Sequence, residues 1–195
     1  GPNTGGMGAY SPLPFITKED YEYALNKIMI PVSEAMVKEG VPFKGVLYGG
    51  LMKTKSGIKV IEFNCRFGDP ETEVVLPRLT SDIYDAFMAI IEGNKPVLSW
   101  EKCYTIGIVL ASKGYPGSYQ KGYVINNAND EHIYHMGTKI DDNGNLVTNG
   151  GRVLFVVGKG DTLEEANKKA ISIVNQIECD NLFHRTDIGA KAYRK

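Results

Sequence analysis

The strongest chemical signal in the sequence is the pair Glu62 and Asn64, which are separated by one residue at the end of a predicted strand. Because alternate residues of a strand project from the same face, this spacing places a carboxylate and an amide oxygen side by side. Mg²⁺ prefers oxygen ligands and takes few carboxylates from the protein, with phosphates and waters completing its octahedron. The spacing predicts a cation site, although a solvated strand face would show the same pattern.

Arg66 follows two residues later, in a loop that contains Gly68 and Pro70. A guanidinium binds phosphate through paired N–H donors, so Arg66 could reach an anion held by the same cation. Together the three residues indicate a nucleotide site for phosphoryl transfer, in which positioning and charge neutralisation provide most of the catalysis. The alternative for Arg66 is a surface ion pair with Asp69 or Glu71.

A second candidate is the glycine-rich segment Asn3–Gly8, which consists of Asn3, Thr4, Gly5, Gly6, Met7 and Gly8. Glycines allow successive backbone N–H groups to converge on an anion, so the segment could form an anion-binding nest. It lacks the Lys-Ser/Thr ending of a P-loop, and no strand precedes it as a dinucleotide-binding motif requires. A mobile or purely structural loop is the alternative.

Two cations, Lys139 and Arg152, flank a predicted Asp-Asn-Gly turn at residues 142–144. A hairpin around that turn could bring them together, and two converging cations would suit a phosphate monoester. Two solvated charges beside a turn remain the alternative. The histidines show no metal-ligand spacing and are predicted to be structural, and no Ser-His-Asp arrangement is found.

The elements that must position these residues fall into two predicted groups. A helix begins at the capping-box residue Thr17, bends at Pro31 and ends at Gly40, and two strands follow at residues 43–52 and 58–63. Helical segments then cover residues 71–92. Further short strands are predicted at residues 104–111, 122–126, 132–136 and 151–157, and a last helix follows Thr162.

Composition gives no bias toward nucleic acid or an anionic membrane, since 22 Lys and Arg oppose 23 Asp and Glu. The three cysteines are widely spaced, and no apolar run approaches the roughly 20 residues that span a bilayer. These features predict a cytoplasmic protein without a nucleic-acid or membrane partner. The opening on a glycine-rich loop suggests a fragment whose amino-terminal part is missing.

Two stretches are similar to a known family: GPNTGGMGAYSPLP at residues 1–14 and IEFNCRFGDPETEVVLPRL at residues 61–79. The similarity continues through YPGSYQKG, HMGTK, TNGGRVLFVVGKG and FHRTDIGAKAY, and so extends over essentially the whole chain. The chain closely resembles the carboxy-terminal half of the phosphoribosylamine–glycine ligases, which belong to the ATP-grasp superfamily.

The resemblance implies an α+β fold in two domains. Residues 1–96 would form the carboxy-terminal part of an ATP-grasp domain, an antiparallel sheet with helices. Residues 97–195 would form a small, mainly antiparallel β domain with a C-terminal helix. The amino-terminal domain and the lid subdomain, which hold substrate and clasp adenine in this family, would be absent.

The resemblance also implies an enzyme that makes glycyl phosphate from ATP and glycine. The amine of 5-phosphoribosylamine would then displace phosphate and give glycinamide ribonucleotide, a step of de novo purine biosynthesis. Glu62 and Asn64 would hold Mg²⁺ or Mn²⁺ against the ATP phosphates, and Arg66 would act catalytically by steadying the transferring phosphate. The Asn3–Gly8 segment would face glycine and the sugar, and Lys139 and Arg152 would hold the ribose phosphate.

One departure from the superfamily concerns the metal. Many ATP-grasp enzymes carry a further acidic ligand on the preceding strand, whereas GVLYGGLM contains none, so the number of metal ions stays open. Because the amino-terminal half and the lid are missing, we expect negligible ligase activity from this chain alone. The alternatives are another ATP-grasp carboxylate–amine ligase and a non-catalytic module that retains the fold.

Overall fold

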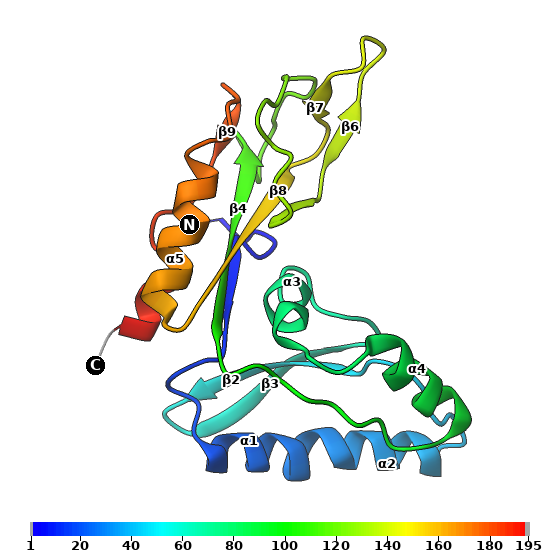
Figure 1. Cartoon of the computed structure of the whole chain (residues 1–195). Helices are drawn as coiled ribbons and strands as arrows, with labels where there is room; N and C mark the ends of the chain where they lie inside the picture. The colour runs from blue at the N-terminus through cyan, green and yellow to red at the C-terminus, as the bar shows by residue number, and fades with distance from the viewer. Residues whose placement is uncertain (1, 194–195) are drawn as a thin grey trace. The chain divides into compact units, whose positions relative to one another are not determined.

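The computed structural model describes residues 2–193, so the first residue of the opening motif lies outside the described part. Contacts divide the chain into two compact units (Figure 1). The hairpin unit contains Leu13–Gly68 and Leu79–Trp100. The sheet unit contains Gly1–Pro12, Asp69–Arg78 and Glu101–Lys195. Each unit combines segments from separate parts of the sequence. The predicted domain boundary at residues 96–97 therefore stays a prediction.

The hairpin unit combines two strands with helices. Its elements are α1 (Lys18–Ala24), a π-helical turn (Leu25–Met29), α2 (Ile30–Lys38), β2 (Tyr48–Thr54), β3 (Gly57–Asn64) and α4 (Ile83–Glu92). The predicted capping box is confirmed, because the Thr17 side chain accepts from the Asp20 backbone while the Asp20 carboxylate accepts from the Thr17 backbone. The sequence therefore determines where the first helix begins.

Pro31 does not end the helix, because the backbone before it adopts a wider turn. It occupies the first turn of α2, directly after the π-helical turn in which Ile30 N–H bonds to Leu25 C=O. A proline ring clashes with the carbonyl four residues earlier, and a wider turn relieves that clash. The α1 and α2 segments consequently run on as one long helix (Figure 1).

The strands β2 and β3 pair in antiparallel fashion, with Tyr48 opposite Asn64 and a register shift between Gly50 and Leu51. The predicted start of the first strand at residue 43 is wrong, because Gly45 adopts a φ of +142° that a regular strand does not use. Gly49 permits the close approach of a side chain from the long helix. A Cβ on Gly49 would lie 2.6 Å from the Met29 sulfur.

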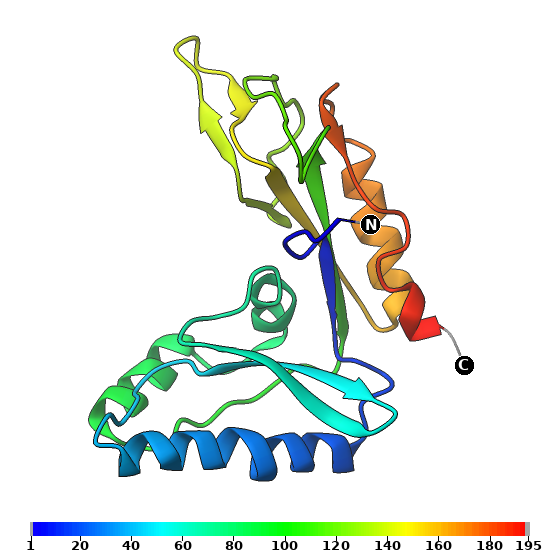
Figure 2. The same cartoon turned by 180° about the vertical axis from the view of Figure 1, so that it is seen from behind.

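The sheet unit is built on a five-stranded antiparallel sheet in the order β1-β4-β8-β5, with β9 pairing to β4 (Figures 1 and 2). A separate pair, β6 and β7, forms the hairpin around the Asp-Asn-Gly turn. The elements are β1 (Gly8–Ser11), α3 (Thr72–Val75), β4 (Tyr104–Ser112), β5 (Ile133–His135), β6 (Thr138–Ile140), β7 (Leu146–Thr148), β8 (Arg152–Gly160), α5 (Leu163–Val174) and β9 (Leu182–Phe183), with 3₁₀ turns at Leu76–Arg78 and Ala190–Tyr193.

The two central strands are buried on both faces. Ile106, Ile108 and Leu110 of β4 join a core that includes the apolar face of α5. The intervening residues pack on the opposite face in a second core with Met7 and Val74. The opening segment and α3 therefore cover this face of the sheet, although they are distant from its central strands in the sequence.

Two sequence expectations for this unit need correction. Residues 122–126 form only isolated bridges, because Gly122 and Asn127 adopt positive φ values of 87° and 58° that interrupt an extended strand. The opening segment, expected as a loop, becomes strand β1 from Gly8 onward. The helical segments predicted over residues 71–92 are observed in two parts, since α3 and its 3₁₀ turn end at Arg78 and α4 of the hairpin unit begins after its cap Asp82.

A substitution at Gly107 tests the packing of this sheet. A Cβ there would lie 1.9 Å from Phe155 Cζ, so Gly107→Ala should lower the free energy of unfolding of the sheet unit by about 1–3 kcal/mol. The added Phe155→Leu change frees space, so the double variant should lose less than the sum of the single losses. Amide hydrogen exchange of β4 measures each variant, and simple additivity would contradict the proposed clash.

Candidate functional site

The predicted carboxylate–amide pair lies at the end of β3. Asn64 Nδ2 donates to Glu62 Oε1 over 3.0 Å, so the two side chains do lie side by side on one face. Glu62 is exposed, and Gly50 opposite it leaves room, since a Cβ there would lie 3.0 Å from Glu62 Cγ. One carboxylate and one amide oxygen fit Mg²⁺ that takes its remaining ligands from phosphates and water.

Arg66 is exposed in the loop after β3, and its Nη1 donates to the Phe67 carbonyl over 2.8 Å. Because its guanidinium makes only this bond within residues 2–193, most of its donors are available. Arg66 is therefore placed two residues beyond the carboxylate–amide pair with donors left for an anionic ligand. Its proposed role toward a phosphate stays a prediction.

The opening segment is held in the sheet unit by an arginine and a tyrosine. Gly5 N–H donates to the Tyr115 hydroxyl over 3.0 Å, and Arg152 Nη1 donates to the Gly6 carbonyl over 3.3 Å. The glycines do not adopt the positive φ that a nest requires. They permit close packing instead, because a Cβ on Gly6 would lie 2.3 Å from Pro70 Cδ.

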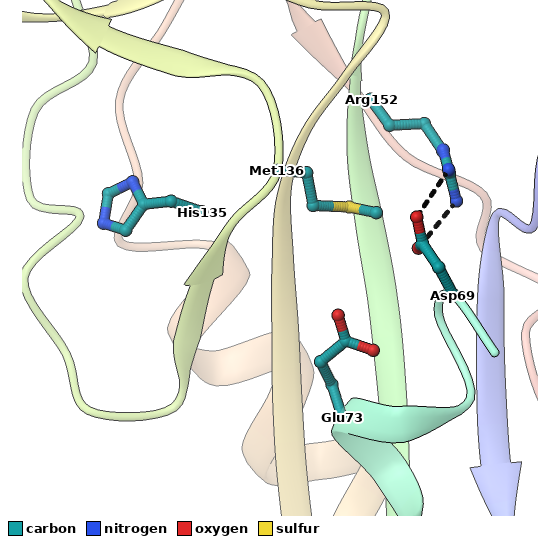
Figure 3. A pocket seen from close by; sticks show the side chains of 5 residues that line it. All are labelled: Asp69, Glu73, His135, Met136 and Arg152. Carbon is teal, nitrogen blue, oxygen red and sulfur yellow. Dashed lines mark hydrogen bonds and ion pairs between the residues drawn. The ribbon is translucent and has the colours of Figure 1, made fainter. Parts of the chain in front are cut away.

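Arg152 has a second partner, Asp69. The two guanidinium nitrogens donate to the two carboxylate oxygens over 3.0 and 2.9 Å, a bidentate pair seen as dashed lines in Figure 3. The Arg152 side chain is 21% exposed and that of Asp69 is 50% exposed, so the pair is partly screened by solvent. Arg152 thus joins the opening segment to the start of α3.

Lys139 lies on β6 opposite Val147 and is exposed. Its charge lowers the pKa of Asp141, after the larger effect of the hydrogen bond from Asn145. Arg152 begins β8 and is engaged by Asp69, so within residues 2–193 the two predicted cations share no common partner. Their joint binding of a phosphate stays a prediction.

A cavity of about 420 Å³ opens beside the Arg152–Asp69 pair (Figure 3). Glu73, from the first turn of α3, points into the region between Met136 and Asp69 (Figure 3). Burial raises the pKa of Glu73, the charges of Asp69 and Glu71 raise it further, and the Arg152 charge opposes them. The cavity therefore contains a carboxyl group that is costly to ionise.

Glu73 gives a stability prediction. Because its pKa is higher in the folded than in the unfolded chain, the free energy of unfolding should fall as pH rises from the unfolded pKa through the folded one. Glu73→Gln removes this loss, so its thermal midpoint should exceed that of the parent at about pH 8. The difference should shrink near pH 4.5, the ordinary pKa of a glutamate. Thermal circular dichroism measures this, and the exposed Glu131→Gln is the control.

Sequence reasoning missed Asp69, Glu73 and Tyr115 as site residues. Asp69 was considered only as an ion-pair partner for Arg66, and Tyr115 occurred only within the family-like stretch YPGSYQKG. The run of three acids in Asp-Pro-Glu-Thr-Glu, at residues 69–73, was the available signal. It could not be interpreted alone, because the cation that meets Asp69 is 83 residues away.

Family models for two domains match the chain. The phosphoribosylglycinamide synthetase ATP-grasp (A) domain matches residues 1–72, and the C domain of the same protein matches residues 105–191. The phosphoribosylamine–glycine ligase of Halalkalibacterium halodurans is 50% identical over 98% of the chain and 46% of its own length. That of Listeria monocytogenes is 48% identical over 98% and 47%. The chain spans about half the length of the curated relatives it matches.

Solved structures with a similar fold include a member of the same family. The phosphoribosylamine–glycine ligase of Thermotoga maritima superposes with a TM-score of 0.83 and 36% identity, over 96% of this chain and 47% of that one. A biotin carboxylase of Campylobacter jejuni has a TM-score of 0.64 at 12% identity, over 91% of this chain and 40% of that one, and so shares the fold alone.

The α+β fold and the match of residues 1–72 to an ATP-grasp domain are those of an ATP-grasp protein, as the sequence predicted. Both matched models carry the same family name, and together they account for most of the chain. The chain belongs to the phosphoribosylglycinamide synthetase family. No helix among residues 2–193 is long and apolar enough to cross a membrane.

Proposed function

We propose that this chain supplies the carboxy-terminal half of a cytoplasmic ATP-dependent ligase that joins glycine to 5-phosphoribosylamine. The products would be glycinamide ribonucleotide, ADP and phosphate, a step of purine biosynthesis. The observation that carries the proposal is 50% identity along 98% of the chain to a phosphoribosylamine–glycine ligase. The side-by-side arrangement of Glu62 and Asn64 supports it independently.

The chemistry requires an activated carboxylate, because a carboxylate oxygen is a poor leaving group toward an amine. An oxygen of glycine attacks the γ-phosphorus of ATP, ADP leaves, and glycyl phosphate forms. The amine then attacks the carbonyl carbon, and phosphate departs with the electron pair of the broken C–O bond. The amine gives up one proton as the amide forms.

The roles of this chain follow from its donors. Glu62 and Asn64 would hold Mg²⁺ or Mn²⁺, which when bound neutralises charge on the phosphates. Arg66 would stabilise the transferring phosphate through its available donors. The Asn3–Gly8 segment and Lys139 would contact glycine and the sugar phosphate, and Arg152 would position the segment through Gly6.

The proposal also requires the other half of the enzyme. Water must be kept from glycyl phosphate until the amine arrives, which calls for a closing lid. The chain alone is therefore expected to have negligible turnover. Its matched relatives are about twice as long, which supports this expectation.

Phosphate release by the protein extended amino-terminally to the length of its relatives tests the proposal. ATP and Mg²⁺ are supplied, and glycine and phosphoribosylamine are each omitted in turn. Release that requires both substrates supports the ligase. Phosphate release that does not depend on glycine but requires another acid would contradict the proposal and indicate a different ATP-grasp ligase.

A further inference from the structure

The cavity beside α3 has an uncompensated charge. Its lining residues, all within the sheet unit, are Asp69, Glu73, His135, Met136 and Arg152. Arg152 and Asp69 neutralise each other through two hydrogen bonds. When Glu73 is ionised, its carboxylate therefore has no cationic partner among the described residues. The cavity favours a ligand that carries positive charge or donates N–H groups.

Glu73 is also incompletely hydrogen-bonded. Its Oε2 is buried and has no hydrogen-bond partner among residues 2–193. A buried acceptor without a donor is unfavourable, and buried polar groups in folded proteins nearly always have partners. This unpartnered acceptor lies at the edge of a cavity about 420 Å³ in volume. A ligand in the cavity could supply the missing hydrogen-bond donor.

The chemistry of the lining selects among ligands. An anion is disfavoured, because an ionised Glu73 would repel it and the terminal nitrogens of Arg152 already donate to Asp69 and Gly6. A hydroxyl donates one hydrogen, whereas an ammonium or amine donates two or three to acceptors on different sides. Glu73 and Asp69 lie on the same segment, and their carboxyl groups line the cavity at separate points (Figure 3).

We propose that this cavity binds a primary amino group, with Glu73 as the hydrogen-bond acceptor at its inner wall and the Asp69 carboxylate as the second acceptor. The inference rests on the proposed function, which has two amines, the ammonium of glycine and the amine of phosphoribosylamine. Met136 supplies an apolar wall beside the carboxyl group of Glu73 (Figure 3). Glu73 is a positioning residue in this account, and it takes no covalent step.

Binding to this chain can be measured without ATP by observing the Glu73 carboxyl carbon by NMR. Glycine is compared with acetate, which lacks the amine, and freshly prepared ribosylamine with ribose. At least one amine should shift the Glu73 resonance saturably and lower its pKa, whereas acetate and ribose should not. Which amine does so identifies the source. Equal shifts from an amine and its matched control, or none at all, would overturn the proposal.

Two variants separate the acceptor from the fold. Glu73→Leu removes the acceptor at similar volume and should weaken amine binding at least tenfold, followed through the His135 resonances. Glu73→Gln keeps a carbonyl acceptor and should bind more tightly than Glu73→Leu. The exposed Glu131→Leu should leave binding unchanged. Affinity that is the same in Glu73→Leu and the parent chain would refute the assignment. If Glu73→Leu does not fold, affinity that is the same in Glu73→Gln, which lacks the charge, and the parent chain would refute it.

The outcome is independent of catalysis. Amine binding at Glu73 without ligation by the extended protein would support this site and contradict the proposed function. Ligation by the extended protein that is unchanged in Glu73→Leu, with no amine shift at this resonance, would keep the function and remove the site.

Discussion

Alanine in place of Glu62 should lower the glycine-dependent phosphate release of the extended protein by about a hundredfold or more. Loss of even an outer partner of a metal ligand costs roughly 10- to 100-fold, and Glu62 is the only carboxylate in the proposed pair. The loss should fall on kcat with ATP and Mg²⁺ saturating, because charge neutralisation is needed most as phosphate transfers. Steady-state phosphate release measures it.

The matched control for Glu62 is Lys59→Ala, an exposed residue of the same strand. It should leave turnover within about twofold, as surface changes away from a site do. Both variants should have unchanged circular dichroism, since neither side chain is buried. Normal turnover by Glu62→Ala would exclude the carboxylate–amide pair as the metal site.

Arg152→Ala should release the opening segment and weaken binding of the proposed sugar substrate by about tenfold or more. The change removes the bidentate pair with Asp69 and the bond to the Gly6 carbonyl together. Because the pair is partly solvated, the sheet unit should lose only about 1 kcal/mol of unfolding free energy. The expected kinetic signature is a raised KM for phosphoribosylamine, with amide exchange at Gly5 and Gly6 accelerated in the same variant.

Arg185→Ala provides the comparison for Arg152. Arg185 also forms a paired contact with an aspartate, Asp187, but that pair is about half exposed on both sides. Its removal should leave exchange at Gly5 and Gly6 unchanged. Arg152→Lys keeps the charge but cannot form the bidentate contact, so it should be intermediate. Unaltered exchange in Arg152→Ala would contradict the role of this residue in ordering the segment.

Local signals in the sequence predicted the local structure well. The Thr17 capping box, the β2–β3 hairpin and the helix after Thr162 all depend on neighbours within a few turns or one tight loop. The Glu62 and Asn64 geometry follows from the same rule, since strand alternation alone places the two side chains together. These local predictions were confirmed, whereas the strand start predicted at residue 43 and the strand predicted at residues 122–126 were wrong.

Long-range pairings could not be predicted in the same way. Gly8–Ser11 is a strand only because β4, about a hundred residues later, offers an edge to pair with. Tyr115 meets Gly5 across 110 residues, and Arg152 meets Asp69 across 83. A glycine-rich loop has no apolar alternation to reveal such partners. The sequence predicted that Arg152 would converge with Lys139, and its contacts with Asp69 and Gly6 could not be predicted.

Oxygen transfer from glycine to phosphate is the most direct test of the central claim. The extended protein is given glycine labelled with ¹⁸O in its carboxylate, together with ATP, Mg²⁺ and phosphoribosylamine, and the product phosphate is analysed by mass spectrometry. If glycyl phosphate forms, each phosphate released should carry one ¹⁸O atom from glycine. Phosphate released without ¹⁸O, at the same rate as ADP, would show that water rather than the glycine carboxylate accepts the phosphoryl group.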